Sequence, residues 1–406
     1  MKSTYRVAVL QSHPIQYFAP LFRRLSQDPE IDLTVLYCSK QGVDEYSDEG
    51  FGLRVQWDIP LLDGYRSKFL PNLRKSDQVA GFYSLTNVSI VRELLAGHYD
   101  ALWVHGHSYL TYILAILVSK VLGIPVLMRC ESHLLLQRSK IKRVLRRPLM
   151  SFFYRQLCRA CLPIGTLNRE FYSFHRVGHH RLFHVPYTVD NNFFMRAVEK
   201  HRGNEAKIKD DFGLPQDKPL IMFVSKFISR KRPMDLLQAY EQLRRGVTSA
   251  ALVLVGSGEE EDALREYVRV HNVPDVFFLG FRNQSELPKC YAIGDIFVLP
   301  SENEPWGLVL NEVMCAGVPV IASSEIGAVR DLVKHGHNGF VYDSGDIKAL
   351  SRHLKTLVSD ADLRMRMGDN SIVRISEWDY EKCVIGIKQA LKSVVKNHAT
   401  KLDGVK

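Results

Sequence analysis

The stretch DIFVLPSENEPWGLVLNEVMCAGVPVIAS, residues 295–323, joins two kinds of pattern. An apolar run ending at Pro300 is followed by a polar loop, ENEPWG, and then by a helix-like run that stops at Gly317, where glycine is favoured after a helix. A second apolar run, VPVIAS, comes next. This order of strand, loop, helix and strand predicts one unit of a parallel β-sheet covered by its connecting helix.

The same alternation extends along the chain. Continuous apolar runs are typical of strands that helices cover on both faces. The runs are Val7–Leu10, Leu33–Tyr37, Ala101–Val104, Val126–Met128, Leu220–Val224, Ala251–Val255, Val276–Leu279, Ile296–Leu299 and Val320–Ala322. Their number favours two sheets, so we expect an α/β protein with two Rossmann-like parallel-sheet domains. Ligands bind at the carboxyl ends of such strands, and two facing domains would form a cleft.

A polar segment separates the two sets of strands. Residues 186–215 contain no long apolar run and end in the turn signal Gly213-Leu214-Pro215. After the last expected strand, the pattern predicts successive amphipathic helices. The predicted parts are an N-terminal domain over 1–190, a linker over 191–215, a C-terminal domain over 216–372, and a helical segment over 373–406 that could pack back on the N-terminal domain.

Composition places the chain among ordinary globular proteins. Its 406 residues are 46% hydrophobic and 24% charged. Seven scattered cysteines form no disulfide framework, which favours a reducing compartment. Cys158 and Cys161 spell C-x-x-C, but without a second pair they are better interpreted as packing residues than as a zinc or redox site.

Neither a targeting segment nor a membrane span is expected. The first apolar run, Val7–Leu10, is too short for a signal sequence. Residues 109–128 approach the ~20 that a bilayer span needs, but Lys120 and Gly123-Ile124-Pro125 interrupt them. A buried helix, a turn and a strand explain this stretch better, and we expect a soluble, cytoplasmic chain.

The loop after Pro300 has residues suited to a polar ligand. Free N–H groups at the start of a helix favour a phosphate, and Gly307 would let a ligand approach the backbone closely. The carboxylates of Glu304 and Glu312 only accept hydrogen bonds, which suits sugar hydroxyls. The spacing alone, however, favours a helix-capping acid and a solvated glutamate.

The residues around the two glutamates change that interpretation. The run PWGLVLNEVMCAGVPVIAS resembles the E-x7-E motif of retaining glycosyltransferases of family 4, which have the GT-B fold. Glu304 and Glu312 occupy the two motif positions. The resemblance implies that Glu304 holds the transferred sugar and Glu312 the ribose of the nucleotide. It also implies that the backbone of Trp306, Gly307 and Leu308 meets the sugar and the diphosphate.

A second match lies upstream, in LIMFVSKFISRKRPMDLLQAYEQL, residues 220–243. Lys226 and Lys231 flank a loop after a strand, and Pro233 suits the first turn of a helix. The family usually has arginine and lysine at these two positions and binds the diphosphate with them. Lys226 therefore keeps the positive charge but lacks the bidentate guanidinium. Without the resemblance, this would be only a basic loop.

Two further matches follow in the expected order. LVLVGSGEEEDAL, residues 252–264, places Gly256 and Gly258 between a strand and a helix, and the resemblance assigns Gly256 to the nucleotide site. VFFLGFRNQSELPKCYAIGDIFVLPS resembles the segment around the nucleobase, with Gly280, Phe281 and Arg282 near the base. The resemblance is close over 216–345 and loose over 1–215.

The N-terminal half departs more from the family pattern. Its first loop, QSHPIQYFAP, lacks the glycines that are common there, and His13 and Gln16 could either face an acceptor or cap a helix. His105 and His107 end a strand as H-x-H, but no third metal ligand is spaced to join them. We interpret His107 as a candidate cleft residue and His105 as structural.

A histidine near the donor sugar commonly follows the next strand in this family. In IPVLMRCESHLLL, residues 124–136, counting from Pro125 puts Glu131 at the matching position, and His133 lies two residues further. Both remain candidates.

No metal cofactor is expected. Asp360-Ala361-Asp362 spells the D-x-D that another glycosyltransferase fold uses to hold a divalent metal. Here it opens a C-terminal helical pattern far in sequence from any phosphate loop. Acids at a helix start are the ordinary interpretation.

Positive charge is concentrated in RSKIKRVLRRPLMSFFYRQLCR, residues 138–159, within a chain of net charge +10. The segment has eight Lys/Arg and no acid, interleaved with large apolar residues and interrupted by Pro148. This composition is typical of a basic amphipathic helix at an anionic membrane surface. A core-packed helix with a solvated basic face is the alternative. Nucleic acid is not expected, because no nucleic-acid motif accompanies the charge.

The resemblance implies a retaining glycosyltransferase. It would move a hexose-type sugar from a UDP- or GDP-linked donor to a saccharide or lipid-linked acceptor, in the synthesis of a surface polysaccharide or glycolipid. The C-terminal domain would hold the donor and the N-terminal domain the acceptor, with the protein peripheral on the inner face of the membrane. The alternatives are a sugar-nucleotide epimerase or phosphorylase of the same fold, and a non-catalytic membrane-binding scaffold.

Overall fold

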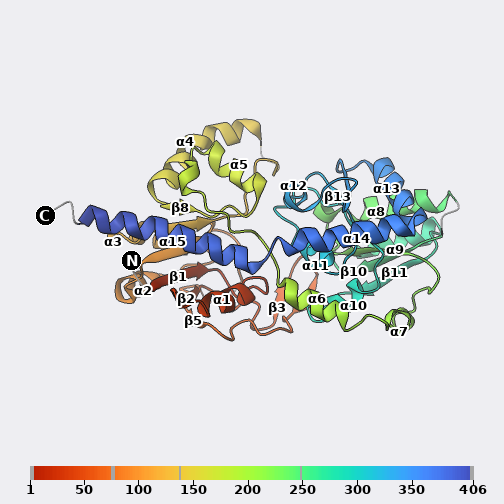
Figure 1. Cartoon of the computed structure of the whole chain (residues 1–406), viewed down its shortest axis with the longest axis horizontal. Coiled ribbons are helices and arrows are strands. Elements are labelled where there is room, and N and C mark those ends of the chain that lie inside the picture. The colour runs from red at the N-terminus through yellow and green to blue at the C-terminus, as the bar shows by residue number, and fades with distance from the viewer. Residues whose placement is uncertain (1–3, 75–77, 137–138, 247–248, 403–406) are drawn as a thin grey trace. The chain divides into compact units, whose positions relative to one another are not determined.

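The computed structural model describes residues 4–74, 78–136, 139–246 and 249–402 (Figure 1). The chain packs into two compact units. The first comprises Met1–Tyr46, Val55–Tyr187 and Tyr380–Lys406. The second comprises Ser47–Arg54 and Thr188–Asp379. Each unit is built around one six-stranded parallel sheet, as the alternating pattern predicted.

The sheet of the first unit has the order β5-β2-β1-β6-β7-β8. Val7 of β1 is aligned with Leu33 of β2 on one side and with Ala101 of β6 on the other. The strands are β1 Tyr5–Gln11, β2 Ile31–Tyr37, β5 Arg66–Phe69, β6 Ala101–His105, β7 Val126–Arg129 and β8 Ala160–Cys161. The four runs predicted in this half all lie in strands. The sequence analysis missed β5, whose first three residues are polar, and β8, which has only two residues.

Helices cover this sheet on both faces. They are α1 Ala19–Ser26, α2 Ile90–Gly97, α3 Leu110–Leu122, α4 Lys140–Gln156, α5 Thr166–Phe174 and α15 Tyr380–Leu402, with a 3-10 turn at His179–Arg181. The long apolar stretch 109–128 divides as predicted: α3 ends at Gly123, which adopts a φ of 73°, and β7 follows. None of the described helices is both long and apolar enough to cross a bilayer.

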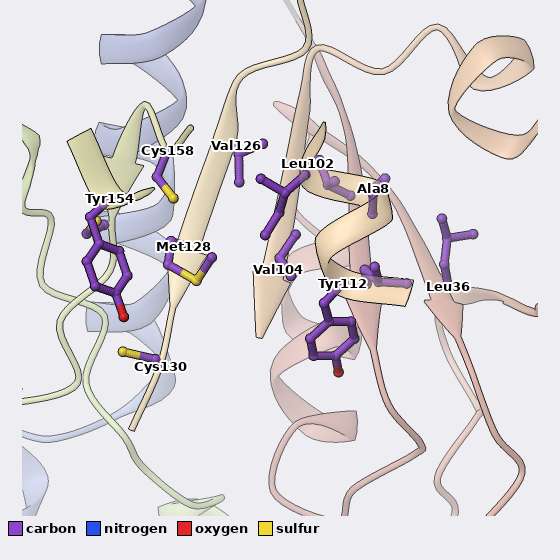
Figure 2. Close-up of a cluster of buried hydrophobic side chains, with 14 of the residues drawn as sticks. Ala8, Leu36, Leu102, Val104, Tyr112, Val126, Met128, Cys130, Tyr154 and Cys158 are labelled. Carbon is purple, nitrogen blue, oxygen red and sulfur yellow. The ribbon is translucent and has the colours of Figure 1, made fainter. Parts of the chain in front are cut away.

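The core of the first unit lies between the sheet and its helices. Figure 2 shows Leu102, Val104 and Met128 of the central strands with Tyr112 of α3 and Tyr154 of α4. Cys158 and Cys161 are buried in the same cluster, and burial raises the pKa of both thiols. The prediction that this C-x-x-C is a packing pair is therefore confirmed.

Helix α15 joins the first unit although it follows the second unit in sequence. It packs against α1. Glu381 pairs with Arg24 of α1, and the Nζ atom of Lys388 lies 3.0 Å from Asp28. The Sγ atom of Cys383 donates to the carbonyl of Pro186 at 3.2 Å.

The sheet of the second unit has the order β11-β10-β9-β12-β13-β14. Its strands are β9 Leu220–Val224, β10 Ala251–Val255, β11 Val276–Gly280, β12 Ile296–Leu299, β13 Val320–Ser323 and β14 Gly339–Tyr342. All five predicted runs form strands, and β14 was missed. The stretch 295–323 is strand, loop, helix and parallel strand, with Phe297 of β12 aligned with Val320 of β13.

The helices of the second unit follow the strands in the predicted alternation. They are α6 Asn191–Glu199, α7 Glu205–Asp211, α8 Pro233–Arg244, α9 Glu261–Val270, α10 Leu287–Tyr291, α11 Leu308–Met314, α12 Val329–Leu332, α13 Ile347–Ser359 and α14 Ala361–Ser376, with a 3-10 turn at Ser229–Lys231. The segment 191–215, expected as a linker, contains α6 and α7. Helix α6 packs on α10 and α11.

A short hairpin completes the second unit. Its strands are β3 Tyr46–Asp48 and β4 Leu53–Val55, and the intervening turn contains Gly50 and Phe51. Residues 47–54 pack with the second unit, although the chain on either side of them belongs to the first.

Candidate functional site

The loop between β12 and α11 carries most of the predicted site residues. Gly307 precedes α11 with a φ of 93°, a conformation that favours glycine. A Cβ atom there would lie 3.0 Å from Cγ2 of Ile326, so the position has little room as well. Trp306 is buried and donates from Nε1 to Oδ1 of Asn311 at 3.0 Å. The loop is thus fixed by its own packing before any ligand binds, and Leu308 begins the helix.

Glu304 and Lys231 form a largely buried ion pair. The Nζ atom of Lys231 donates to the Glu304 carboxylate, and the two side chains are 12% and 10% exposed. Arg230 adds a second cation, with Nη1 at 3.7 Å from the same carboxylate oxygen. The backbone carbonyl of Glu304 accepts from Gly327 at 3.0 Å, which holds the loop against the turn after β13. The structure therefore brings together two predicted residues that lie 73 positions apart.

Burial and pairing act in opposite directions on Lys231. Burial lowers the pKa of this ammonium group, and the Glu304 carboxylate partly offsets that effect. Removing the carboxylate would leave a cation with little access to water. A ligand phosphate at this position would meet a lysine that already needs an anionic partner.

Glu312 lies on α11 and faces a different partner. Its side chain is 1% exposed and accepts a hydrogen bond of 2.5 Å from the hydroxyl group of Tyr291 on α10. The sequence analysis did not identify Tyr291, because no neighbouring residue in the sequence indicates that its hydroxyl group has a polar partner. Glu304 and Glu312 therefore have distinct surroundings: one is tied to cations of the β9–α8 loop, the other to a phenol.

Lys226 is paired with the β3–β4 hairpin. Its Nζ atom lies 2.6 Å from Oδ1 of Asp48 and 4.7 Å from the centroid of the Phe51 ring. Phe51 in turn contacts Phe281, with ring centroids 4.8 Å apart, and its carbonyl accepts from the hydroxyl of Ser257 at 2.7 Å. The hairpin thus contacts two predicted nucleotide-site residues, Lys226 and Phe281. Asp48 and Phe51 were missed because no local pattern connects them with Lys226, which lies 178 residues after Asp48.

Gly256 and Gly258 are required by packing of the chain on itself. A Cβ atom on Gly256 would lie 1.9 Å from the carbonyl oxygen of Ser225, and one on Gly258 would lie 2.5 Å from that of Phe227. Their φ angles are 138° and 155°. These glycines let the loop after β10 lie against the loop after β9, which gives them a structural role in addition to the predicted one.

The remaining predicted base-side residues lie after β11. Gly280 has a φ of 70° and open space where a Cβ would project, and its carbonyl accepts from the amide of Gly256 at 2.8 Å. Arg282 pairs with Glu286 at 3.2 Å, and its guanidinium lies 5.2 Å from the ring centroid of Phe212.

In the first unit, exposure separates the two candidates that follow β7. Glu131 is exposed and hydrogen-bonds with the phenol of Tyr187, whereas His133 is buried. Tyr187 also stacks under the guanidinium of Arg129, at 5.0 Å from the ring centroid. Burial, together with the Glu131 charge, raises the pKa of Tyr187 well above its usual value. Only Glu131 of this pair is directly open to a ligand.

The histidines of the first unit have mainly aromatic or buried surroundings. His107 packs against the rings of Phe153 and Tyr154, with centroid distances of 5.3 Å and 6.0 Å. His105 stacks on Trp103, and burial lowers its pKa well below the usual value. His13 contacts the Ser12 hydroxyl at 3.0 Å through Nδ1, and burial lowers its pKa to about 4. His105 therefore has the structural surroundings predicted for it.

The acidic and metal-ligating side chains of the described residues form no cluster suited to a cation. In the described residues, no three His, Cys, Asp or Glu side chains are grouped to hold a metal ion. Asp360 caps α14 by accepting from the amide of Leu363 at 2.8 Å. The prediction that this D-x-D is a helix start is confirmed.

Comparison with known proteins gives a family for part of the chain. Residues 204–374 match the family described as "Glycosyl transferases group 1". N-acetyl-alpha-D-glucosaminyl L-malate synthase of Bacillus anthracis is 31% identical over 166 residues, which are 41% of this chain and 42% of the relative. A GDP-mannose-dependent alpha-(1-6)-phosphatidylinositol monomannoside mannosyltransferase of Mycobacterium tuberculosis is 33% identical over 160 residues, 37% and 41% of the two chains. The matched segment thus spans less than half the length of both relatives.

A solved structure matches nearly the whole chain. Anabaena Alr3699/HepE in complex with UDP superposes with a TM-score of 0.73 at 17% identity, covering 96% of this chain and 100% of that one. The two parallel-sheet units and this match establish the GT-B fold.

Proposed function

We propose that this GT-B chain is a retaining glycosyltransferase of the family 4 type, which moves a hexose-type sugar from a nucleotide-sugar to a saccharide or lipid-linked acceptor. The observation that carries the proposal is the buried pair of Lys231 and Glu304 beside Gly307, within the segment that matches "Glycosyl transferases group 1". The mycobacterial relative depends on GDP-mannose, and the Anabaena structure contains UDP, which supports a UDP- or GDP-linked donor.

The donor would be held by the second unit. Lys226 and Lys231 would neutralise the charge of the diphosphate. The backbone amides of Gly307 and Leu308 would donate hydrogen bonds to it. We assign the binding to these individual amides because the seven-residue α11 is too short to have a strong helix dipole. Glu304 would bind the sugar. Glu312 would bind the ribose. The base would be contacted by Gly280, Phe281 and Arg282, and the pocket would be shaped by Trp306 and Gly256.

The chemistry follows from the charges of these groups. As the bond to the anomeric carbon breaks, negative charge grows on the leaving diphosphate. A buried ammonium group such as Lys231 stabilises that charge more strongly than a solvated one would. The leaving phosphate can take the proton of the acceptor hydroxyl on the same face of the sugar, which would give retention without a protein base.

The acceptor would be bound by the first unit. Glu131 is the candidate that is open to ligand, and its carboxylate could accept from an acceptor or donor-sugar hydroxyl. His133 and His107 would then shape the site from behind. The acceptor proposal draws support from the M. tuberculosis relative, which is a phosphatidylinositol monomannoside mannosyltransferase.

A ligand screen followed by product analysis tests the proposal. Nucleoside diphosphates and their sugars should raise the melting temperature, since a ligand at 100 times its Kd adds about 2.7 kcal/mol. With the stabilising donor and a panel of acceptors, NMR should show the same anomeric configuration in product and donor. Turnover should persist in EDTA, because lysines supply the positive charge. Inversion, or complete loss in EDTA with recovery in Mg²⁺, would contradict the mechanism.

The same assay separates the alternatives. An epimerase would convert the donor without any acceptor, and a phosphorylase would require inorganic phosphate. A non-catalytic scaffold would give neither donor hydrolysis nor transfer.

A further inference from the structure

Helix α4 is apolar on two opposite faces. Its inner face packs in the core of the first unit through Tyr154, which is fully buried, and through Met150, Phe153 and Leu157. Figure 2 shows Tyr154 beside Met128 and Cys130. This inner face anchors the helix in the core of the first unit. Apolar residues on the other side therefore need a separate explanation.

The outer face carries five large apolar side chains that are 61–74% exposed. They are Ile141, Val144, Leu145, Leu149 and Phe152. The spacings of three, four, eight and eleven residues from Ile141 place them on one side of the helix. Isolated exposed apolar residues are common on protein surfaces, but a contiguous stripe of this kind marks an interaction site.

The charge around this stripe has one sign. Residues 132–169 contain nine Lys/Arg and no Asp or Glu, and six of the nine basic residues belong to α4. Arg146 and Arg155 are exposed. A second copy of this face would repel the first, and a nucleic-acid backbone would not use five exposed aliphatic and aromatic groups. An apolar stripe flanked by cations complements an anionic lipid surface, in which the acyl region takes the stripe and the headgroups take the cations.

We propose that the outer face of α4 docks on an anionic lipid bilayer, with the side chains of Ile141, Leu145, Leu149 and Phe152 inserted below the headgroups. The helix lies in the plane of the membrane surface, as an interfacial amphipathic helix does. This docking is independent of the proposed sugar transfer, because it uses no residue assigned to the donor.

The structure also shows which cations are free for docking. Arg143 donates from Nη1 to the carbonyl of Leu134 at 2.8 Å, and Arg147 donates from Nε to that of Phe174 at 2.9 Å. Arg147 also lies 4.6 Å from the Phe174 ring centroid. These two arginines fasten α4 to its neighbours, so neutralising them would disturb the fold. Arg146 and Arg155 are the better test positions, while the side chain of Lys142 is outside the described residues.

Vesicle flotation of the full chain tests the stripe and the charge separately. Wild type should float with vesicles of 70% phosphatidylcholine and 30% phosphatidylglycerol, and not with phosphatidylcholine alone. The stripe variant Leu145→Ser/Leu149→Ser/Phe152→Ser should lose at least tenfold in binding. The charge variant Arg146→Gln/Arg155→Gln should lose severalfold, with weaker dependence on salt.

Matched controls lie in the second unit. Val270→Ser/Met365→Ser/Val373→Ser removes three apolar side chains of 57–65% exposure, and Arg352→Gln/Arg366→Gln removes two exposed cations. Both should float like wild type. Circular dichroism and the melting temperature should show that every variant is folded.

Insertion of α4 into the bilayer can be measured directly with a fluorescent label on its outer face. All seven native cysteines are buried, so a Leu149→Cys variant offers one accessible thiol for an environment-sensitive nitrobenzoxadiazole dye. Its emission should shift to the blue on anionic vesicles, whereas the same dye on Val373→Cys should not respond. Equal flotation of wild type with neutral and anionic vesicles or with neither, unchanged flotation of the stripe variant, or no shift at position 149 would overturn the proposal. A wild-type dimer that the stripe variant abolishes would also overturn it, by assigning the face to self-association.

Discussion

Lys226 and Asp48 form an ion pair with 2.6 Å between Nζ and Oδ1, although 178 residues separate them in sequence. The lysine assigned to the donor diphosphate is therefore paired with a carboxylate from a hairpin of its own unit. Phe51 of the same hairpin contacts Phe281, which is assigned to the base. A nucleotide that reaches Lys226 must compete with Asp48 for the ammonium group or share it.

Asp48→Asn should therefore tighten the binding of a nucleoside diphosphate. The pair is partly exposed, at 32% and 12% of its side chains, so the competition is worth about 0.2–1 kcal/mol, or roughly a 1.5- to 5-fold change in Kd. Isothermal titration calorimetry measures it. Glu49→Gln removes the same charge from an exposed neighbour and should change Kd less. Weaker binding by Asp48→Asn would mean that the aspartate positions the lysine for the ligand.

The two glutamates should have separable roles. Glu304→Gln should lower turnover roughly tenfold to a hundredfold, the effect of losing about 1.5–3 kcal/mol of a charged hydrogen bond. Its affinity for free nucleoside diphosphate should not fall, because Lys231 loses its internal counter-charge. Glu312→Gln should instead weaken nucleotide binding by a similar factor.

Tyr291→Phe is the control for Glu312. It removes the 2.5 Å hydrogen bond to that carboxylate but leaves the carboxylate itself in place. A ribose contact predicts that Tyr291→Phe binds nucleotide better than Glu312→Gln does. Identical kinetic profiles for the Glu304 and Glu312 variants would show that the division of roles is wrong.

Gly256→Ala should destabilise the second unit more than Gly280→Ala. Gly256→Ala puts a methyl group 1.9 Å from a backbone carbonyl oxygen, so strands β9 and β10 must shift apart. This shift should lower the free energy of unfolding by about 1–3 kcal/mol or more. The methyl group of Gly280→Ala would meet no atom within 4 Å. Only the backbone φ of 70° is unfavourable for alanine, and it should lower the free energy of unfolding by about 1–2 kcal/mol. Urea denaturation of both variants compares the two costs. A Gly256→Ala protein of wild-type stability with reduced nucleotide affinity would restrict that glycine to ligand approach.

The first unit should lose stability as the pH falls from 6.5 to about 4. Burial lowers the pKa values of His13, His175 and His184 to about 4, while the unfolded chain keeps values near 6.5. Protons therefore bind the unfolded state preferentially in this window, and the stability present above pH 6.5 is progressively lost below it. His13→Gln should flatten the dependence of the melting temperature on pH between 6.5 and 4.5. The control His179→Gln, at an exposed position, should leave the pH dependence of the melting temperature unchanged. Equal pH dependence in the two variants would refute the role of His13 in acid destabilisation.

Most strands that the sequence predicted are continuously buried; β11, which is half-buried throughout, is an exception. Strands such as Ile296–Leu299 and Val320–Ser323 are apolar because both faces are covered, and the pattern is therefore local. Strand β5 is polar at three of its four positions, and β14 is a four-residue strand that begins with Gly339, so neither gave a long apolar run. Glycine and proline marked the ends of α3 and the start of α8 correctly for the same local reason.

The candidate site was predictable only where its residues follow one another closely. The motif that contains Glu304 and Gly307 could be identified from sequence, and so could the loop with Lys231. Contacts across long separations could not: Asp48 with Lys226, or Tyr291 with Glu312, depend on how distant loops meet. The basic segment was found from its composition, but the anchoring role of Arg143 and Arg147 appears only in three dimensions.

The order of synthesis follows from the position of α15. The first unit needs Tyr380–Leu402 to cover α1, yet these residues are translated after the whole of Thr188–Asp379. On the ribosome, the second unit has its complete sheet available while the first still exposes the α1 surface that Glu381 and Lys388 later contact. The half of the protein that is translated first is therefore the half that is completed last.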